Sequence, residues 1–197
     1  ERIVENDEAL MNEYLDGTEI QLDVLKKNLR KAVIGNEIFP VLTGSSLKNK
    51  GVQLVLDAVV DYLPSPIDLL PAKGVNPDTH EEETRHASDD APFSALIFKL
   101  QVDPFVGALT FFRVYSGTVS AGETILNAAT GRKERVGRLV LLQADKRQDL
   151  TQVHAGEIAA FVGMKEFKIG QTVCSPDHPI MLEAIIFPQP VISMRIE

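Results

Sequence analysis

The sequence contains a single cysteine, Cys174, among its 197 residues. One thiol excludes an internal disulfide framework and is typical of a protein of the reducing cytoplasm. Because Cys174 follows Thr172 and Val173 in an apolar stretch, we interpret it as a small buried residue rather than a nucleophile. The sequence also has no apolar run near the roughly 20 residues of a membrane span, and no signal-peptide pattern at Glu1. We therefore expect a cytoplasmic protein with no membrane partner.

Motifs for catalysis and metal binding are missing from the sequence as well. No G-x-x-x-x-G-K-[ST] phosphate loop occurs, so the residues that hold a nucleoside triphosphate and Mg²⁺ are absent from these 197 residues. Ser45 and Ser46 have no histidine at an informative spacing, which leaves nucleophilic catalysis unsupported. His80 and His86 have no cysteine or third histidine at ligand spacing. We predict no catalytic residue and no metal ligand here.

The overall charge is acidic, with a formal net charge of −8. This charge argues against a chain that coats nucleic acid over its whole surface, so any RNA contact must come from a local patch. With 44% hydrophobic and 24% charged residues, the composition is that of a soluble globular protein of one or two domains. Nothing in it indicates an obligate oligomer, and we expect a monomer.

Helical patterns occupy the first part of the chain. Asn6 or Asp7 can cap a short helix that ends at Gly17. Thr18 and Gln21 have the spacing of a capping box, which predicts a second helix beginning there. This helix carries basic residues mostly outside its apolar stripe, and we interpret them as a solvated face.

The stretch from Pro40 to Pro66 predicts a strand, a polar turn and a third helix. Residues 38–42 are strand formers that lead into the turn at Gly44, and apolar residues recur at helical spacing until Pro64 ends the helix. A strand that leads into a small-residue turn and a packed helix is typical of the edge of a doubly wound nucleotide-binding sheet. On spacing alone, any other strand–turn–helix unit fits equally well.

Beyond residue 66 the pattern changes twice. Residues 67–91 contain helix breakers and an excess of acidic residues, which predicts a solvated connector with some strand character. From Pro92 to residue 192, several short strands separated by glycine turns predict a closed or nearly closed β-barrel. We predict that residues 193–197 begin a linker to a further domain. The predicted fold class is an α/β edge followed by an all-β barrel.

Short sequence segments throughout most of the chain resemble those of bacterial translation elongation factor G, a translational GTPase. In the first part these are GSSL at Gly44–Leu47, KNKGVQ and DYLPSP. In the second part they are PFSALIFK, DPFVGALTFFRVYSG, GRKERVGRL and AGEIAAFVG. Ser46 stands where this family usually has alanine, and residues 142–144 and 170–173 also depart from its pattern.

The resemblance implies a domain and a role for each part of the chain. Residues 1–66 would be the C-terminal part of a P-loop GTPase domain, and residues 92–192 the second-domain barrel. The backbone amides of Gly44, Ser45, Ser46 and Leu47 would form the turn that holds the guanine base. The intact protein would bind GTP or GDP with Mg²⁺ and use GTP hydrolysis to drive translocation of tRNA and mRNA on the ribosome. Because the chain begins without methionine, we expect an excised piece that neither hydrolyses GTP nor binds it tightly.

The segment from Arg132 to Arg147 is the candidate RNA contact. Six basic residues against two acidic ones leave a local charge of +4. Alternation along a strand places Lys133 and Arg135 on one face. We predict that Lys133, Arg135 and Arg138 bind phosphate, and the resemblance implies that the partner is small-subunit ribosomal RNA. A solvated barrel rim is the competing interpretation.

Two other functions stay open. The chain fits another translational GTPase, such as a ribosome-recycling paralogue or a ribosomal protection protein. It also fits a non-enzymatic RNA-binding β-barrel module. In that module Phe105, Phe111, Phe112 and Tyr115 would stack on bases, although we favour a role for these aromatic residues in the core or an interface.

Overall fold

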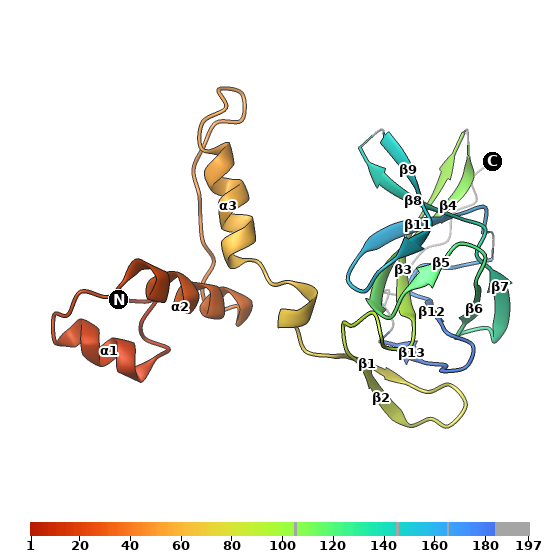
Figure 1. The fold of residues 1–197 in the computed structure, drawn as a ribbon, viewed down its shortest axis with the longest axis horizontal. Coiled ribbons are helices and arrows are strands. Elements are labelled where there is room, and N and C mark those ends of the chain that lie inside the picture. The colour runs from red at the N-terminus through yellow and green to blue at the C-terminus, as the bar shows by residue number, and fades with distance from the viewer. Residues whose placement is uncertain (105, 145, 165, 184–197) are drawn as a thin grey trace, which may run out of the picture. The chain divides into compact units, whose positions relative to one another are not determined.

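Two units divide the chain after Asp68, and each is described by itself. The structure, a computed structural model, describes residues 1–183 except 105, 145 and 165 (Figure 1). The end of the predicted barrel and the predicted linker at 193–197 therefore lie outside the described residues. Within the described part of the chain, no helix is long and apolar enough to cross a membrane.

The first unit is helical. It contains α1 (Glu8–Leu15), α2 (Leu22–Ile34), α3 (Val52–Tyr62) and a short 3₁₀ turn at Pro66–Asp68 (Figure 1). Asp7 caps α1 as predicted, because its carboxylate accepts hydrogen bonds from the backbone amides of Ala9 and Leu10 at 3.1 and 3.2 Å. Gly17, with φ +73°, follows the C-terminal end of α1, and α3 ends before Pro64. All three predicted helices are present, and the predicted ends of α1 and α3 are confirmed.

The predicted capping box at the start of α2 is wrong. Gln21 is the residue before the helix and makes no side-chain capping bond. The reason is that the Thr18 amide is bonded to the carbonyl of Glu13 at 3.0 Å, which keeps Thr18 in the turn that closes α1. The helix therefore begins later than the motif suggested.

The predicted strand at residues 38–42 is also wrong for this unit. These residues have no regular secondary structure, and Phe39 and Val41 are 73% and 89% exposed. A strand exists only when its backbone groups pair with a neighbour. Among the described residues of this unit, the only β-type pairing is an isolated bridge between Ser45 and Lys50.

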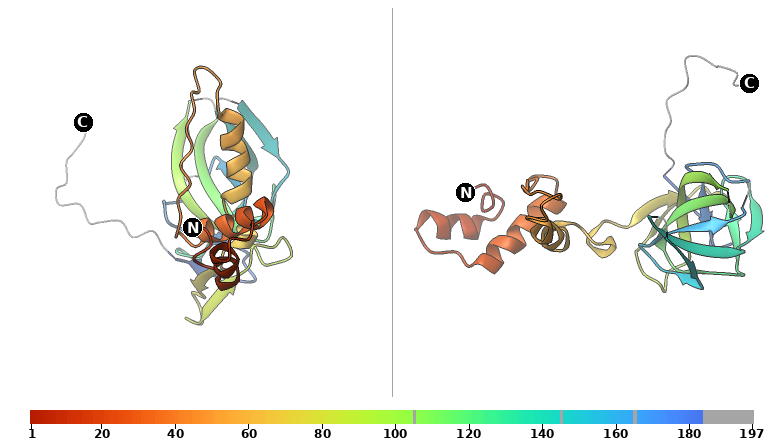
Figure 2. Two further views of the ribbon diagram at one scale, coloured as in Figure 1. Left: turned by 90° about the vertical axis from the view of Figure 1, so that its left-hand side faces the viewer. Right: turned by 90° about the horizontal axis from the view of Figure 1, so that it is seen from above.

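The second unit is built from antiparallel strands. An eight-stranded sheet has the order β7-β6-β12-β3-β4-β11-β8-β9, and β5 pairs with β10. The bounds are β3 Ser94–Asp103, β4 Gly107–Ser116, β5 Val119–Ser120, β6 Thr124–Asn127, β7 Arg132–Arg135, β8 Arg138–Gln143, β9 Lys146–Leu150, β10 Gln152–Val153, β11 Ile158–Val162 and β12 Thr172–Cys174. Figure 2 shows the strands curling around a common interior, which makes the unit barrel-like as predicted.

Most of the predicted connector, residues 69–91, belongs to this unit and contains a hairpin. Strands β1 (Ala72–Val75) and β2 (Glu82–Arg85) pair with each other, and β1 also pairs with β13 (Met181–Leu182). The strand character expected for this stretch thus takes the form of a three-stranded sheet, which the sequence pattern did not predict.

The barrel interior is a continuous apolar core. Phe112 of β4 and Phe161 of β11 stack with ring centroids 3.9 Å apart, and both are fully buried. Where the chain leaves β4, Gly117 lies against the segment that enters the barrel. A Cβ atom there would come within 2.5 Å of the Ala91 carbonyl oxygen, and φ is +68°. Only glycine fits that contact without strain.

A β-bulge shapes the long β3–β4 hairpin. Ile97 pairs with Phe112 and Lys99 pairs with Phe111, so Phe98 has no partner opposite it. The bulge keeps Ile97 in the core while Lys99 lies on the outer face, with its Nζ 4.9 Å from the centre of the Phe111 ring.

Candidate functional site

The predicted guanine turn, Gly44–Leu47, lies in a small closed loop. The Ser45 amide donates to the Lys50 carbonyl at 2.9 Å, and the Lys50 amide donates back to the Ser45 carbonyl at 3.0 Å. Within the loop, the Asn49 amide donates to the Ser46 carbonyl at 3.1 Å. These bonds fix the backbone of the turn without help from a second segment.

Glycine is required on both sides of this loop. A Cβ atom at Gly44 would lie 2.8 Å from the Lys50 carbonyl oxygen. Gly51 has φ +76°, and a Cβ atom there would lie 2.9 Å from the Thr43 carbonyl oxygen. The two backbones approach so closely that any side chain at either position would force them apart.

The loop divides the predicted backbone donors into two kinds. The Ser45 amide is already used inside the loop. The amides of Ser46 and Leu47 donate to no acceptor within the residues that the structure describes, and Leu47 is 95% exposed. Two adjacent amides without an internal acceptor can bind a carbonyl oxygen or a ring nitrogen of a planar ligand.

The basic segment is less positive in three dimensions than in sequence. Three of its arginines form ion pairs with acidic residues from outside the segment. These pairs are Arg132 with Glu166, Arg138 with Asp149 at 2.8 Å, and Arg147 with Asp103 at 2.5 Å. The local excess of positive charge predicted from the sequence is therefore largely offset.

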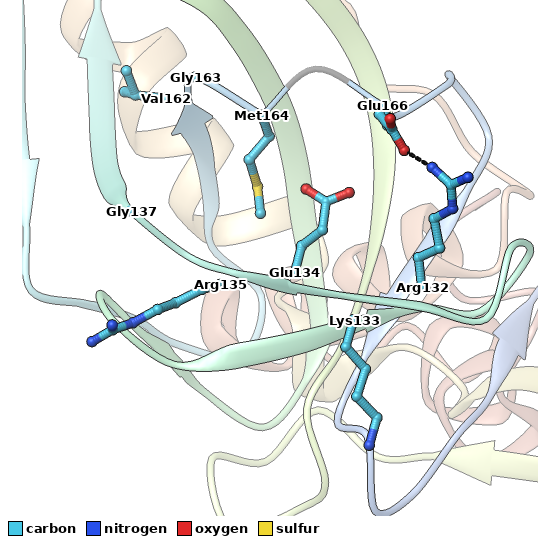
Figure 3. A pocket seen from close by; sticks show the side chains of 9 residues that line it. All are labelled: Arg132, Lys133, Glu134, Arg135, Gly137, Val162, Gly163, Met164 and Glu166. Carbon is cyan, nitrogen blue, oxygen red and sulfur yellow. Dashed lines mark hydrogen bonds and ion pairs between the residues drawn. The ribbon is translucent and has the colours of Figure 1, made fainter.

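Lys133 and Arg135 are the exposed cations that stay without an ion pair among the described residues of β7. Figure 3 shows Arg132 and Glu134 on one side of the strand and Lys133 on the other, as alternation predicts. Arg135 is held by its Nε, which donates to the Gly122 carbonyl at 3.0 Å. Since Nε is the atom that is anchored, the guanidinium is positioned with its terminal nitrogens available for an anion.

A shallow hollow of about 650 Å³ lies beside β7. Its lining includes the side chains of Arg132, Glu134, Arg135, Met164 and Glu166 (Figure 3). The Arg132–Glu166 pair forms part of the lining, while Arg135 extends toward solvent. An extended, negatively charged ligand fits this open shape better than an enclosed small molecule does.

Glu134 is the titratable group in this hollow whose pKa is shifted. Partial burial raises the pKa of the Glu134 carboxyl, and the nearby charge of Glu166 raises it further, whereas Arg132 opposes the change. An anion bound at Arg135 would act in the same direction as Glu166, because it adds negative charge.

The acidic partners of the basic segment could not be predicted from the sequence. Glu166 is 34 residues from Arg132, and Asp103 is 44 residues from Arg147. The anchor of Arg135 is a backbone carbonyl, at Gly122, which carries no sequence signature. These contacts depend on strand order, which a local pattern does not reveal.

The aromatic residues occupy the positions favoured from the sequence. Phe112 lies in the core, and Tyr115 packs against a second buried cluster that contains Cys174. Phe111 is half-buried under Lys99 on the outer face. Phe105 lies outside the described residues. Cys174 is buried, and desolvation raises the pKa of its thiol.

Two comparisons with known proteins bear on this geometry. Residues 92–176 match the family model described as Elongation factor G domain 2. The structure is also similar to a crystal structure of a protein from Thermus thermophilus, with a TM-score of 0.69 and 24% sequence identity. That similarity covers 97% of this chain and 26% of the other chain, so this chain spans about a quarter of that protein's length.

The family match identifies the barrel, from Pro92 to Pro176, as related to the second domain of a translation elongation factor. At 24% identity, the similarity to the Thermus thermophilus structure concerns the fold alone. The strands that carry the candidate RNA contact, β7 and β8, lie within the matched range.

Proposed function

We propose that this chain is part of an elongation factor G that couples GTP hydrolysis to the movement of tRNA and mRNA through the ribosome. The observation that carries this proposal is the match of residues 92–176 to the second domain of that factor. The segments GSSL, KNKGVQ and DYLPSP in the first 66 residues support the same assignment.

In this proposal, the helical unit is the C-terminal part of the GTPase domain. Its surface supports this role, because α3 buries none of its residues and Leu54, Leu56 and Val60 are all more than 60% exposed. So much exposed apolar surface marks a face that another part of the protein covers. In the intact protein, a nucleotide-binding sheet would cover it.

The Gly44–Leu47 turn then contributes to guanine binding through the amides of Ser46 and Leu47. The Ser45 amide, which is bonded to Lys50, has a structural role in this proposal. GTP or GDP and Mg²⁺ would bind to the intact protein, where a phosphate loop supplies the remaining contacts. The described residues contain no group of three or more potential metal ligands. We expect the 197-residue chain alone to show neither GTP hydrolysis nor tight nucleotide binding.

The barrel is proposed to contact small-subunit ribosomal RNA through Lys133 and Arg135. Arg138 contributes less, because a phosphate would have to compete with Asp149 at 2.8 Å. The intact factor would act as a monomer in the cytoplasm.

A second candidate is a non-enzymatic RNA-binding barrel, favoured by the limits of the family match, which covers only residues 92–176. Sequencing the gene upstream of Glu1 separates the two. A phosphate loop followed by an Asn-Lys-x-Asp motif supports the GTPase. A start codon near Glu1 with neither motif would leave the barrel module. A recycling or protection factor would have the same motifs, and a translocation assay with the intact protein distinguishes it.

Ribosome binding tests the barrel's role directly. The double substitution Lys133→Glu and Arg135→Glu in the intact factor should abolish most co-sedimentation with ribosomes, and the residual binding should depend less on salt. The matched control is Lys27→Glu and Lys31→Glu on the exposed face of α2, which changes the net charge equally. Equal effects of the two double substitutions would contradict the proposed RNA contact.

A further inference from the structure

The outer face of the β6–β7 hairpin carries both cations of the candidate RNA contact. Thr124 of β6 lies directly opposite Arg135 of β7, and Leu126 lies opposite Lys133. Ile125, between Thr124 and Leu126, belongs to the buried core, so its neighbours face outward. Residues directly opposite each other share a face of the sheet, and a long side chain also reaches its diagonal neighbour. Thr124 is therefore beside Arg135 and diagonal to Lys133 on one exposed face.

A second hollow, which we call the hairpin hollow, lies on this face. Its volume is about 460 Å³, and both Thr124 and Lys133 line it. Figure 3 shows the Lys133 side chain on the side of β7 opposite Glu134, which agrees with its place in this second hollow. The polar lining consists of one cation, two carboxylates and three hydroxyls, from Lys133, Glu123, Asp177, Thr118, Thr124 and Ser175.

Glu123 brings to this hollow a carboxylate with a fixed orientation. One of its oxygens accepts a hydrogen bond from the Ser120 amide at 2.8 Å, and its backbone carbonyl accepts one from the Val136 amide at 2.8 Å. On the same turn, the Gly122 carbonyl accepts the Nε of Arg135 at 3.0 Å. The exposed Glu123 carboxylate is thus held close to the Arg135 guanidinium, and its second oxygen can accept a further hydrogen bond.

The mixture of charges in the hairpin hollow determines which part of an RNA strand can enter it. A phosphate is attracted by Lys133 and Arg135 but repelled by Glu123 and Asp177, so it stays at the cations. The sugar is uncharged, and its 2′-hydroxyl can donate to a carboxylate. Lys133 and Arg135 are two residues apart, about 6.6 Å along the strand, so they can hold successive phosphates with one sugar between them.

We propose that the hairpin hollow recognises the ribose of the RNA whose phosphates bind to Lys133 and Arg135, and that the Glu123 carboxylate accepts a hydrogen bond from its 2′-hydroxyl. This inference rests on the proposed RNA contact and adds a preference for RNA over DNA, because deoxyribose has no 2′-hydroxyl. In an RNA helix the 2′-hydroxyls lie along a wide, shallow groove. A shallow hollow on an exposed strand pair can reach them there without opening the helix.

The first experiment compares the binding of two short duplexes of the same sequence to the 197-residue chain. One is RNA, and the other carries 2′-fluoro sugars, which keep the A-form helix and the phosphates but cannot donate a hydrogen bond. We expect the fluorinated duplex to bind about tenfold more weakly, the effect of losing one hydrogen bond to a charged acceptor. The slope of affinity against salt should be the same for both duplexes, because their phosphates are identical.

The substitution Glu123→Gln assigns this preference to the hairpin hollow. Glutamine keeps an oxygen for the Ser120 amide but has no charge. The preference should fall to about threefold, since charge-assisted hydrogen bonds are roughly twice as strong as neutral ones. The fluorinated duplex should bind this variant more tightly than it binds the unchanged chain, because a negative charge beside the cations is gone.

Glu157→Gln is the matched control for this substitution. Glu157 is also exposed, and its carboxylate accepts the amide of a residue three positions earlier, His154, at 2.8 Å. It lies outside the lining of the hairpin hollow. The control should therefore leave the preference at about tenfold. Thermal unfolding of both variants checks that neither turn has been disrupted.

Failure of this inference can be told from failure of the proposed RNA contact. Arg135→Ala should reduce the salt slope by about one, because it removes one phosphate contact. If it does so while the two duplexes bind the unchanged chain equally well, the phosphate contact stands and the ribose proposal is overturned. If neither duplex binds, both are overturned. A preference that Glu123→Gln leaves intact, or that Glu157→Gln lowers equally, would place the hydroxyl contact elsewhere and overturn the proposal for this hollow.

Discussion

The two units of this chain differ in where their apolar residues lie. In the barrel, Phe93, Ile97, Phe112, Val114 and Phe161 belong to one continuous buried core. In the helical unit, the buried hydrophobic residues are Val4, Leu10 and Ala32, and the most apolar helix, α3, contributes none. The barrel therefore has an apolar core of its own, whereas the helical unit leaves most of its apolar side chains exposed. The following predictions test that difference.

Truncation of an apolar side chain should show the largest difference in stability between the two units. Phe112→Ala removes a fully buried stacked ring and should destabilise the barrel by about 3–5 kcal/mol. Leu56→Ala in α3 removes a side chain that is 61% exposed and should change stability by less than about 0.5 kcal/mol. Urea unfolding of the 197-residue chain, followed by amide exchange in each unit, measures both. A large loss from Leu56→Ala would mean that α3 is already packed in solution.

Replacing two glycines with alanine compares how closely the chain packs around each of them. The two positions have similar positive φ angles, so the backbone strain is about equal. Gly117 and Gly17 have φ of +68° and +73°, but a Cβ atom would clash at Gly117 and meets nothing within 4 Å at Gly17. Gly117→Ala should cost about 3 kcal/mol, since strain and overpacking add, whereas Gly17→Ala should cost about 1 kcal/mol. Thermal unfolding checks the order, and similar costs would show that the barrel entry relaxes readily.

The N-terminal cap of α1 should have a smaller effect that stays within the helical unit. Asp7→Ala leaves the amides of Ala9 and Leu10 without their acceptor and should cost about 1 kcal/mol. Asp7→Asn, which keeps an acceptor oxygen, is the matched control and should preserve most of the stability. Far-ultraviolet circular dichroism during unfolding measures the change, which should be absent from amide exchange in the barrel.

The smallest effect concerns the pH dependence of the barrel. The pKa of Glu134 is raised in the folded state, so the folded state binds more protons than the unfolded state in the interval above its ordinary pKa of 4.5. Stability should therefore fall slightly as pH rises through this interval and should be flatter in Glu134→Gln. Titration of the Glu134 carboxyl by NMR gives the direct check, and a pKa at or below 4.5 would contradict it.

The sequence predicted those features that depend on neighbouring residues. The Asp7 cap, the stop at Gly17 and the end of α3 before Pro64 need only local chemistry, and each was confirmed. The strand at 38–42 was predicted wrongly, because its residues favour a strand only when a partner strand is present. The capping box at Thr18 and Gln21 failed since Thr18 is bound to the preceding turn.

The candidate sites show the same limit. The closed loop that holds Gly44–Leu47 agrees with its small residues, yet the use of the Ser45 amide by Lys50 was not predictable from composition. The charge of Arg132, Arg138 and Arg147 was counted correctly, but Glu166 and Asp103, the partners of Arg132 and Arg147, are distant in sequence.

The bulge at Phe98 has a consequence for how this hairpin tolerates changes in length. Because Phe98 has no residue opposite it, deleting it would leave Ile97 facing Phe112 and Lys99 facing Phe111 in uninterrupted pairing. Deleting Gln101 instead would shift Leu100 or Val102 to the opposite face, since alternate residues of a strand face opposite sides. Insertions and deletions in related barrels should therefore accumulate at Phe98 and be rare between Lys99 and Asp103, although all of these positions belong to one strand.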